Sequence, residues 1–450
     1  MIIPIILFLI FFTILAWKKL DWALLLIIAT LPSYLIRFQV INIPLTLLEG
    51  MILIAFAVWV ISKDGLKLKG LFKKEGKRAY PYHFEIIAVL VLAWIGIIVA
   101  GIKPEALGTF KAYFIEPILL FILIINKLRD EAGQKKIIYS LAISALVVSL
   151  LAIYQKITGQ FISNPFWANA ETRRAVSFFG YPNAIGLYLA PIIMLMTGQL
   201  FKSILNKEKI FLVATIIFSI LAIYFAKSEG ALLGLLAASF FCALLANKKL
   251  RITAIVLASV GLITIFSINS LRTYVVSKIT LTDLSGQIRQ QQWIETKKML
   301  AANSYLQGVG LSNYQAAVAP YHQEGIFLKN NDPDWLNKIR TSEEFRQKMW
   351  QPTEIYMYPH NIFLNFWSEL GLLGALLFSW IIAKFLWQSS TLYLKERNFL
   401  ALGLFGAMLV ILIHGLVDVP YFKNDLSALF WILIALLGAL RLNTKSPIKI

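Results

Sequence analysis

The sequence predicts an all-α integral membrane protein with about 12–13 transmembrane helices and one long extracytoplasmic helical loop. The composition is the first reason. Of 450 residues, 58% are hydrophobic and 15% are charged, whereas soluble domains contain about 45–50% apolar and about 25% charged residues. The mean hydropathy is +0.71. The second and third reasons are the apolar runs and the distribution of charge along the chain.

Thirteen apolar segments approach the length of a membrane-spanning helix, which is about 20 residues. Because the first two segments are short, twelve crossings remain an alternative. No basic residue precedes the first segment, so we expect no cleavable signal there. The segments lie at residues 2–17, 21–36, 44–62, 84–101, 109–126, 137–156, 182–201, 210–226, 230–246, 252–269, 362–387, 399–417 and 426–441.

The net charge of +19 is divided unequally between alternate loops. The loops on the side that begins at Lys18 and Lys19 hold 25 of the 43 basic and 8 of the 24 acidic residues, and seven of the basic ones lie in Lys63–Arg78. The excess is therefore +17 on that side and +2 on the other. Basic loops face the cytoplasm, so thirteen crossings place the N-terminus outside. This topology explains the charge, and we expect no nucleic-acid partner.

The helices and loops divide the chain into five regions. We expect N-terminal transmembrane helices at 1–156 and central transmembrane helices with an Arg-bearing external loop at 157–269. A large extracytoplasmic loop follows at 270–361, then C-terminal transmembrane helices at 362–441 and a cytoplasmic tail at 442–450. The large loop contains an amphipathic pattern over Gln287–Asn303, with Trp293, Met299 and Leu300 on its apolar stripe. We interpret this loop as a lid over the membrane domain.

Three arginines stand where the predicted external loops meet the membrane. Arg173 and Arg174 precede the helix entered at Pro182 and Asn183, and Arg289 lies in the amphipathic lid helix. A guanidinium group stays charged and binds phosphate oxygens through two parallel hydrogen bonds. These residues suit a lipid-linked phosphate or diphosphate at the outer leaflet. The alternative, which composition alone favours, is pairing with ordinary lipid phosphates or acidic side chains.

His360 and Asn361 immediately precede another predicted helix. Histidine is the side chain best suited to accept a proton near neutral pH. Beside the arginines, His360 would complete a site for transfer of a group from a phosphate-linked donor. The alternative is a capping or interfacial role, which is the commoner one for a single histidine before a helix.

Other polar residues allow two interpretations. Asp332-Pro333-Asp334 has the form of a metal-binding pair, but Asp334 before Trp335–Ile339 is favoured as a helix cap. Charged groups in apolar helices are costly and are functional candidates, although near helix ends they can also be snorkelling side chains. Cys242 lies in an apolar helix, and we expect a buried, inert thiol. The charged candidates are Glu49, Glu116, Glu369, His414 and Asp418.

Several segments resemble the O-antigen ligase and polymerase superfamily over about residues 160–440. Its hallmark is His followed by Asn, Ser or Gln, nine residues and Gly-x-x-Gly, which here corresponds to His360, Asn361, Gly371 and Gly374. Further resemblances lie in Arg174–Asn183, in Arg289 followed by Trp293 and Gly308–Leu311, and in His414–Asp418. The chain departs from the family at Ser228-Glu229-Gly230, where members often have Ser-Arg-Gly and here Lys227 stands alongside. It also has Ala375 where ligases often have threonine.

The resemblance implies a GT-C-like membrane glycosyltransferase. Such an enzyme transfers a preassembled glycan from undecaprenyl diphosphate to lipid A core or another cell-surface acceptor, on the outer face of the plasma (inner) membrane. The implied reaction is inverting and uses no metal or other cofactor. An O-antigen or exopolysaccharide polymerase, or a protein O-glycosylating enzyme, is an alternative in the same superfamily. A transporter or flippase of polysaccharide or lipid-linked glycan is the alternative from another class.

The resemblance also implies roles for particular residues. His360, Arg289 and Arg174 would be catalytic, with the arginines holding the departing diphosphate and the histidine taking the proton of the acceptor hydroxyl. Arg173, Asn183, Asn361 and Asp418 would bind substrate. For Gly371 and Gly374 we favour a packing role, because glycines three apart let a neighbouring helix approach closely.

Overall fold

The computed structural model describes residues 2–40, 43–62, 80–202, 205–303, 305–330 and 332–443. Across these ranges the chain is mainly helical, and its strands form two short antiparallel hairpins. The predicted all-α fold class is therefore confirmed. The dense basic segment Lys63–Arg78 and residues 444–450 of the predicted tail lie outside the described residues.

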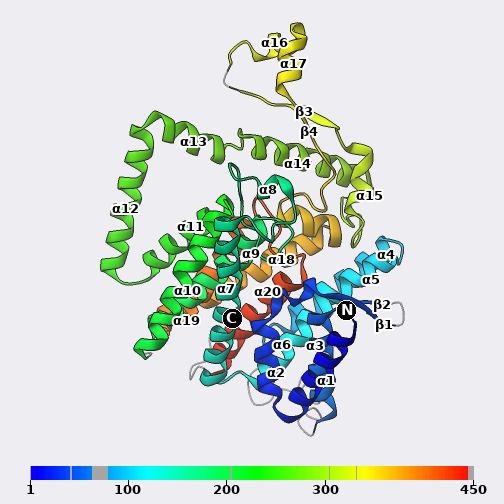
Figure 1. The fold of residues 1–450 in the computed structure, drawn as a ribbon, viewed down its shortest axis with the longest axis vertical. Helices are drawn as coiled ribbons and strands as arrows, with labels where there is room; N and C mark the ends of the chain where they lie inside the picture. The colour runs from blue at the N-terminus through cyan, green and yellow to red at the C-terminus, as the bar shows by residue number, and fades with distance from the viewer. Residues whose placement is uncertain are drawn as a thin grey trace.

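The chain folds into helices in the following order (Figure 1). Residues before the large loop form α1 (Ile2–Lys18), α2 (Leu20–Ala29), η1 (Leu31–Leu35), α3 (Leu47–Ile61), α4 (His83–Val99), α5 (Pro104–Phe110), the π-helical η3 (Lys111–Ile115), α6 (Glu116–Lys127), α7 (Glu131–Thr158), α8 (Pro165–Ala168), α9 (Asn183–Leu200), α10 (Asn206–Phe225), α11 (Glu229–Leu245) and α12 (Lys248–Ser267). The rest forms α13 (Asn269–Ile279), α14 (Leu284–Asn303), α15 (Tyr314–Val318), η4 (Ala319–Tyr321), α16 (Trp335–Thr341), α17 (Glu343–Met349), α18 (Ile362–Glu396), α19 (Phe399–His414) and α20 (Asn424–Asn443).

Each of the thirteen predicted apolar segments contains an apolar helix. Among the described residues, seven helical stretches are long and apolar enough to cross a membrane: α5–α6, α7, α9, α10, α12, α18 and α20. Six shorter apolar helices correspond to the remaining segments, namely α1, α2, α3, α4, α11 and α19. The protein is thus an all-α membrane protein, and the number of crossings stays a prediction.

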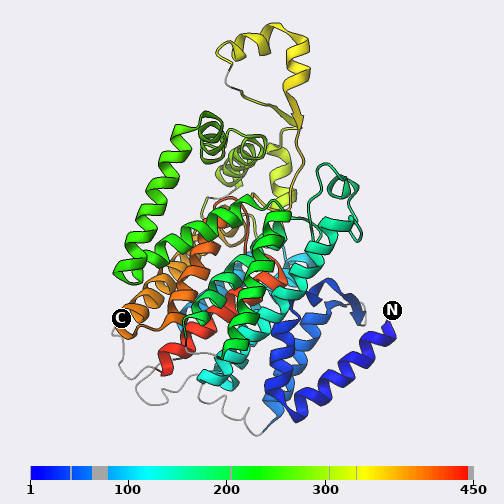
Figure 2. The same cartoon turned by 60° about the vertical axis from the view of Figure 1, so that its left-hand side comes forward.

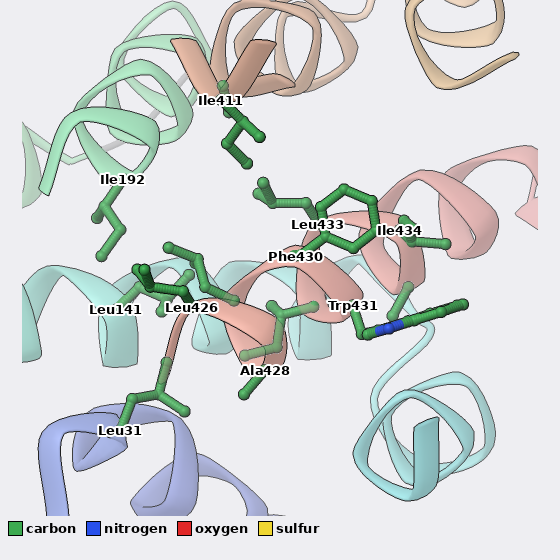
Figure 3. Close-up of a cluster of buried hydrophobic side chains, with 14 of the residues drawn as sticks. Leu31, Leu141, Ile192, Ile411, Leu426, Ala428, Phe430, Trp431, Leu433 and Ile434 are labelled. Atoms are coloured by element: carbon green, nitrogen blue, oxygen red, sulfur yellow. The ribbon is translucent and has the colours of Figure 1, made fainter. Parts of the chain in front are cut away.

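Helix α20 forms the centre of the bundle. Every residue from Asp425 to Leu440 is buried, because α6, α9, α18 and α19 all pack around it. Figure 3 shows Phe430, Trp431 and Leu433 of α20 among side chains from the surrounding helices. The Trp431 Nε1–H donates a hydrogen bond to the Tyr421 hydroxyl at 3.1 Å, so the single polar atom of this ring is satisfied in the core.

The large loop lies beyond one end of the bundle (Figures 1 and 2). The predicted amphipathic helix is confirmed as α14. Met299 and Leu300 are buried in a small second core. Val309, Tyr314 and Val318 complete this core. Beyond it, β3 (Gly325–Phe327) pairs with β4 (Trp350–Pro352), and α16 and α17 project outward.

Sequence reasoning missed both hairpins and assigned one cap wrongly. In the first hairpin, β1 (Arg37–Val40) pairs with β2 (Ile43–Thr46) in the short connection before α3. Asp334 occupies the N-cap position of α16, but its side chain makes no capping hydrogen bond. Asp332 is the structural residue of this turn, because its carboxylate accepts from the Asp334 N–H at 3.0 Å and pairs with Lys338 at 2.6 Å.

Helix α18 is broken at Gly371, where φ is 74° and ψ is 179°. The break exposes backbone groups that the loop before α15 satisfies. The Val309 N–H donates to the Ser368 carbonyl at 2.8 Å, and the Leu372 N–H donates to the Leu306 carbonyl at 3.0 Å. The predicted packing role of Gly371 is thus corrected, because a loop approaches it instead of a neighbouring helix. A Cβ at this position would lie 2.3 Å from the Leu306 carbonyl oxygen.

Candidate functional site

Arg174 is held near the C-terminal end of α7 by a network around Gln155. The Gln155 side chain is fully buried, and its amide oxygen accepts from the Val176 and Ser177 N–H groups at 3.0 and 2.6 Å. Its amide nitrogen donates to the Phe161 and Ser177 carbonyls, both at 2.9 Å. Four hydrogen bonds from one buried side chain restrain the loop, which positions Arg174 beside the start of α11.

The Arg174 guanidinium reaches across to the turn between α10 and α11. Its Nε–H donates to the Ala226 carbonyl at 2.9 Å, and one terminal nitrogen donates to Asn183 Oδ1 at 3.1 Å. Burial lowers the pKa of Arg174, nearby Glu229 opposes this change, and nearby Arg289 adds to it. An arginine nevertheless stays charged at neutral pH, so Arg174 and Arg289 are two positive groups close enough to influence each other.

Arg289 approaches the same place from the lid helix α14. One terminal nitrogen donates to the Ser285 hydroxyl at 2.8 Å. Its Nε is buried and has no hydrogen-bond partner among the described residues. An unpaired buried donor is costly, and a guanidinium with free donors is suited to phosphate oxygens.

Arg174 and Arg289 line one cavity of about 470 Å³. This volume lies within the range of small-molecule sites. Its polar wall comes from the loop before α9, the start of α11, α13 and α14, and its apolar wall includes Leu233, Val275 and Ile279. We call it the cation cavity. Its other lining residues are Asn183, Lys227, Glu229, Gly230, Tyr274, Lys278, Leu281, Asp283, Ser285, His414 and Val417.

His360 lies beside this cavity but is not part of its lining. Its Nδ1 lies 2.9 Å from Oε1 of Gln292, which is one helical turn after Arg289 on α14. The His360 ring packs edge-to-face against Tyr356 and Tyr358, with centroid distances of 5.0 and 5.2 Å. Burial lowers the pKa of His360, Asp418 opposes this change, and Arg289 adds to it. The imidazole is therefore neutral and able to accept a proton at neutral pH.

Aromatic side chains next to His360 surround the ammonium group of Lys423, which lies in the loop between α19 and α20. The Tyr358 and Tyr181 hydroxyls are 3.0 Å apart. The Lys423 ammonium lies 4.7 Å from the Tyr181 ring centroid and 5.2 Å from that of Phe179. Cation–π contacts of this kind stabilise a buried ammonium. The loop between α19 and α20 thus connects the Arg174 loop with the segment that carries His360.

The two predicted substrate-binding residues Asn183 and Asp418 contact each other. Asn183 Nδ2 donates to Asp418 Oδ2 at 3.3 Å, while Asn183 Oδ1 accepts from Arg174. Asp418 is buried, and its Oδ1 accepts from the Val419 N–H at 2.8 Å. Asn183 therefore links the buried Asp418 carboxylate to the Arg174 guanidinium and helps to fix the orientation of that guanidinium. Among these two, Asn183 lines the cation cavity.

Arg173 and Asn361 lie in structural positions outside the lining of this cavity. Arg173 donates to the Lys156 and Ile157 carbonyls at 3.2 Å each, and so satisfies backbone groups at the end of α7. The Asn361 side chain caps α18 by accepting from the Phe363 and Leu364 N–H groups at 3.0 Å. Its amide nitrogen donates to the Leu416 carbonyl at 3.0 Å. Their predicted substrate-binding roles stay predictions.

Sequence reasoning missed Lys278 as a member of the cation cavity, whereas it had noted Lys227 and His414. Lys227 and Lys278 add two ammonium groups, so a cation does stand at the turn where the family often has arginine. Lys278 pairs with Glu229 at 2.7 Å and with Asp283 at 2.8 Å. His414 lines the cavity with an unpartnered Nδ1. Long-range packing decides these positions. The signals in the sequence were the motif similarity of His414, its place in an apolar helix, and the position of Lys227 beside Ser228-Glu229-Gly230.

The cavity is rich in cations and in hydrogen-bond donors. Among the described residues, no group of three or more His, Cys, Asp and Glu side chains is placed to hold a metal ion. The side chains present can bind an anionic group between Arg174 and Arg289, beside a neutral imidazole. The three predicted catalytic residues thus lie in one region, with the arginines in a common cavity.

The fold and the site define an all-α membrane protein with a cation-lined cavity beneath a large loop at one end of the bundle. Residues 214–379 match the family model described as O-antigen ligase. The match runs from α10 into α18 and includes Arg289, His360 and Gly371. The predicted resemblance to the O-antigen ligase superfamily is therefore confirmed. No curated protein matches the chain.

Proposed function

We propose that the protein is a membrane glycosyltransferase that moves a preassembled glycan from undecaprenyl diphosphate to an acceptor at the outer face of the plasma membrane. The observation that carries this proposal is the cation cavity with a neutral imidazole beside it. Arg174 and Arg289 come from segments more than a hundred residues apart and line the same cavity. This arrangement suits a diphosphate leaving group, and the match to the O-antigen ligase family supports it.

The reaction can be written with these residues. The acceptor hydroxyl oxygen attacks the anomeric carbon, and the bond from that carbon to the diphosphate oxygen breaks. The electron pair leaves with the diphosphate, whose growing charge Arg174 and Arg289 stabilise. Donors already held in place for such a charge contribute about 10²–10³ in rate each. Attack opposite the leaving group inverts the anomeric configuration.

His360 takes the proton of the acceptor hydroxyl. With the Gln292 amide oxygen facing Nδ1 at 2.9 Å, Nδ1 carries the hydrogen and Nε2 has the free lone pair. General base catalysis of this kind contributes about 10²–10⁴ in rate. Transport without covalent chemistry has no need of this base, so His360 separates the proposal from a flippase or transporter.

The test is transfer by purified protein in lipid vesicles that contain a defined undecaprenyl-diphosphate-linked glycan. Lipid A core, a second lipid-linked glycan and a peptide hydroxyl are offered as acceptors, which separates ligase, polymerase and protein-glycosylating activities. We expect His360→Ala and Arg289→Ala to insert and unfold like wild type but to lose transfer. The matched controls are His83→Ala and Arg340→Ala, because both residues are exposed and outside the cation cavity. Wild-type transfer by His360→Ala or Arg289→Ala would refute the assigned roles.

A further inference from the structure

A second cavity lies between the C-terminal end of α7, the short helix α8 and the loop before α9. Its volume is about 470 Å³, which is within the range of small-molecule sites. Figures 1 and 2 show α8 at the end of the bundle that carries the large loop. We call this cavity the α7–α8 pocket. Four aromatic rings and two small polar side chains are among its lining residues, namely Phe161, Trp167, Phe178, Phe179, Ser163 and Asn164.

Aromatic rings remain accessible in the α7–α8 pocket. Phe161 is 74% exposed and Phe178 is 47% exposed, although both line the pocket. Phe179 is buried and therefore contributes to the floor of the pocket. Aromatic side chains have large apolar surfaces, and covering such a surface is favourable in proportion to its area. A ligand with a flat apolar face would therefore gain free energy by covering Phe161 and Phe178.

Two residues of the pocket have backbone conformations that non-glycine residues seldom adopt. The φ angle is 60° at Phe161 and 53° at Ser177. One buried amide holds both, because Gln155 Nε2 donates to the carbonyls of Phe161 and Ser177. The Ser177 hydroxyl also donates to the Val148 carbonyl at 2.8 Å. Strained backbone persists only where contacts determine it and is concentrated at functional sites, including ligand clamps. The segments that carry Phe161 and Phe178 are therefore held in fixed positions before a ligand binds.

The lining of the pocket favours a neutral ligand with polarised C–H groups and hydroxyl groups. Of the described residues that line the pocket, none is charged, so a phosphate or carboxylate group would find no counter-ion there. The Asn164 amide oxygen accepts from the Phe166 N–H at 2.9 Å, which leaves the amide NH2 as a donor to a ligand, and the Ser163 hydroxyl both donates and accepts. The negative faces of aromatic rings attract groups with partial positive charge. A sugar ring offers polarised C–H groups on one face and hydroxyl groups at its edge.

The α7–α8 pocket is connected to the cation cavity through one backbone hydrogen bond. The Arg174 N–H donates to the Trp167 carbonyl at 3.1 Å. Trp167 lines the α7–α8 pocket, and the Arg174 side chain lines the cation cavity. The two cavities therefore meet at the segment that contains Arg174. A glycan that reacts beside Arg174 has a second binding surface next to it, and this surface has no need of phosphate or lipid.

We propose that the α7–α8 pocket is a saccharide subsite, in which a neutral sugar residue stacks on Phe161, Trp167 and Phe178. The assignment rests on the proposed function for the identity of the substrate, and it adds the surface that reads the sugar. The sugar residue belongs either to the donor glycan or to the acceptor glycan. Ring stacking distinguishes this occupant from an acyl chain, because an acyl chain binds an aliphatic surface as well as an aromatic one.

The first experiment measures saccharide binding without transfer. The full-length protein in phospholipid nanodiscs, free of sugar-based detergent, is titrated with two lipid-free glycans. One is the neutral oligosaccharide released from the lipid-linked donor, and the other is dephosphorylated core oligosaccharide released from lipid A core. For one of the two, Phe178→Leu should raise Kd about five- to tenfold, because the apolar volume is kept but the aromatic face is lost. Phe178→Tyr keeps that face and should bind like wild type.

The matched control is Phe166→Ala, compared with Phe178→Ala. Phe166 is 71% exposed and lies in the same external segment, but it is not among the lining residues of the pocket. The glycan whose Kd rises in Phe178→Ala and not in Phe166→Ala identifies the source of the sugar. Equal binding by these two variants, wild-type binding by Phe178→Leu, or no binding of either glycan to wild type would overturn the proposal.

Steady-state transfer separates this proposal from the proposed function. Phe178→Leu should raise KM for the substrate that contains the identified glycan by the same factor and leave kcat nearly unchanged, because the pocket lies beside the reacting bond and not at it. A lower kcat with an unchanged KM would overturn the saccharide subsite. Glycan binding that depends on Phe178, in a wild-type protein without transfer activity, would refute the proposed function and support the subsite.

Discussion

At the scale of single residues, His360 combines backbone strain with a fixed side chain. Its φ is 44°, which is the left-handed region that non-glycine residues seldom adopt. The two tyrosine rings and Gln292 hold the imidazole in this conformation. Strained backbone of this kind persists only where surrounding contacts determine it, and it is concentrated at functional sites. The position of His360 is therefore set by residues outside the sequence motif to which it belongs.

The pH dependence of transfer should report the ionisation of His360. Its pKa lies below the ordinary 6.5, mainly because of burial, and Asp418 partly offsets this effect. A base acts only when unprotonated, so kcat/KM should fall as the pH drops through a pKa below 6.5. In Asp418→Asn the amide still offers an oxygen to Asn183, but the offset is lost. We therefore expect the acid limb to move to lower pH.

The control for this prediction is Glu344→Gln, which removes an exposed carboxylate from α17 in the large loop. Its pH profile should match that of wild type. An acid limb that moves to higher pH in Asp418→Asn, or that does not move, would contradict the electrostatic role of Asp418 at His360.

Replacing Arg173 and replacing its neighbour Arg174 should have different effects on the protein. Arg173 satisfies backbone carbonyls at the end of α7, so Arg173→Ala should lower the free energy of unfolding by about 2 kcal/mol. Its KM for the donor should change little. Arg174 lines the cation cavity, so Arg174→Ala should lower kcat/KM by about 10²-fold or more. Thermal unfolding and steady-state kinetics of both variants check this, and a large KM change in Arg173→Ala would assign it to substrate binding.

At the scale of elements, the Arg174 loop depends on one buried side chain in α7. Gln155 satisfies two carbonyls and two N–H groups of residues 161–177. Ala175 adds a backbone hydrogen bond from its N–H to the Phe225 carbonyl at 3.1 Å. These bonds connect the loop to α7 and α10, so the position of Arg174 follows from the packing of those helices.

Removing the Gln155 amide should therefore affect both stability and catalysis. Gln155→Leu leaves buried backbone groups unpaired, and each such group costs about 1–3 kcal/mol. We expect a lower unfolding midpoint and a several-fold lower kcat, because Arg174 loses its support. The matched control is Gln160→Leu, since Gln160 is exposed and accepts a hydrogen bond from the Tyr154 hydroxyl. Similar behaviour of both variants in chemical denaturation and kinetics would contradict this role.

At the scale of the whole molecule, the large loop packs against the bundle at two glycines, Gly310 in the loop and Gly371 in α18. Gly310 has φ of 85°, and the next residue, Leu311, donates its N–H to the Gly96 carbonyl of α4 at 3.1 Å. The large loop also contacts the break in α18 at Gly371, where the Leu372 N–H donates to the Leu306 carbonyl. These contacts fix the large loop against α4 and α18, and α14 with Arg289 and Gln292 is part of that loop.

Replacement of Gly310 should separate the large loop from the bundle. In Gly310→Ala the new Cβ would lie 2.4 Å from the Ala100 backbone nitrogen. The control Gly101→Ala also has a positive φ, of 83°, but its Cβ would meet nothing within 4 Å. Both variants place alanine in an unfavourable backbone conformation, and only in Gly310→Ala does the new Cβ also clash with the backbone of α4 and Ala100. We expect transfer to be lost in Gly310→Ala and largely kept in Gly101→Ala.

Proteolysis measures the position of the loop directly. Gly310→Ala should be cut faster within residues 305–330 than wild type, whereas Gly101→Ala should not. Equal cleavage and equal transfer in the two variants would show that the contact with α4 does not control the large loop.

Much of the fold was predictable because it depends on local sequence. Each of the thirteen apolar segments became a helix, since a hydrocarbon environment requires every backbone group to be satisfied within the segment. The amphipathic period likewise located α14. The break at Gly371 was not predicted, because the loop that satisfies the exposed backbone groups lies some sixty residues earlier in the chain.

The sequence by itself determined the fold class, the helical segments, the candidate residues Arg174, Arg289 and His360, and the resemblance to a family. Only the tertiary structure decided that the two arginines share a cavity, that Arg173 supports α7, and that Lys227 and Lys278 join the cation cavity. The physical reason is the range of the interactions. Helix formation in an apolar run depends on near neighbours, whereas a cavity is the space left between side chains from distant segments.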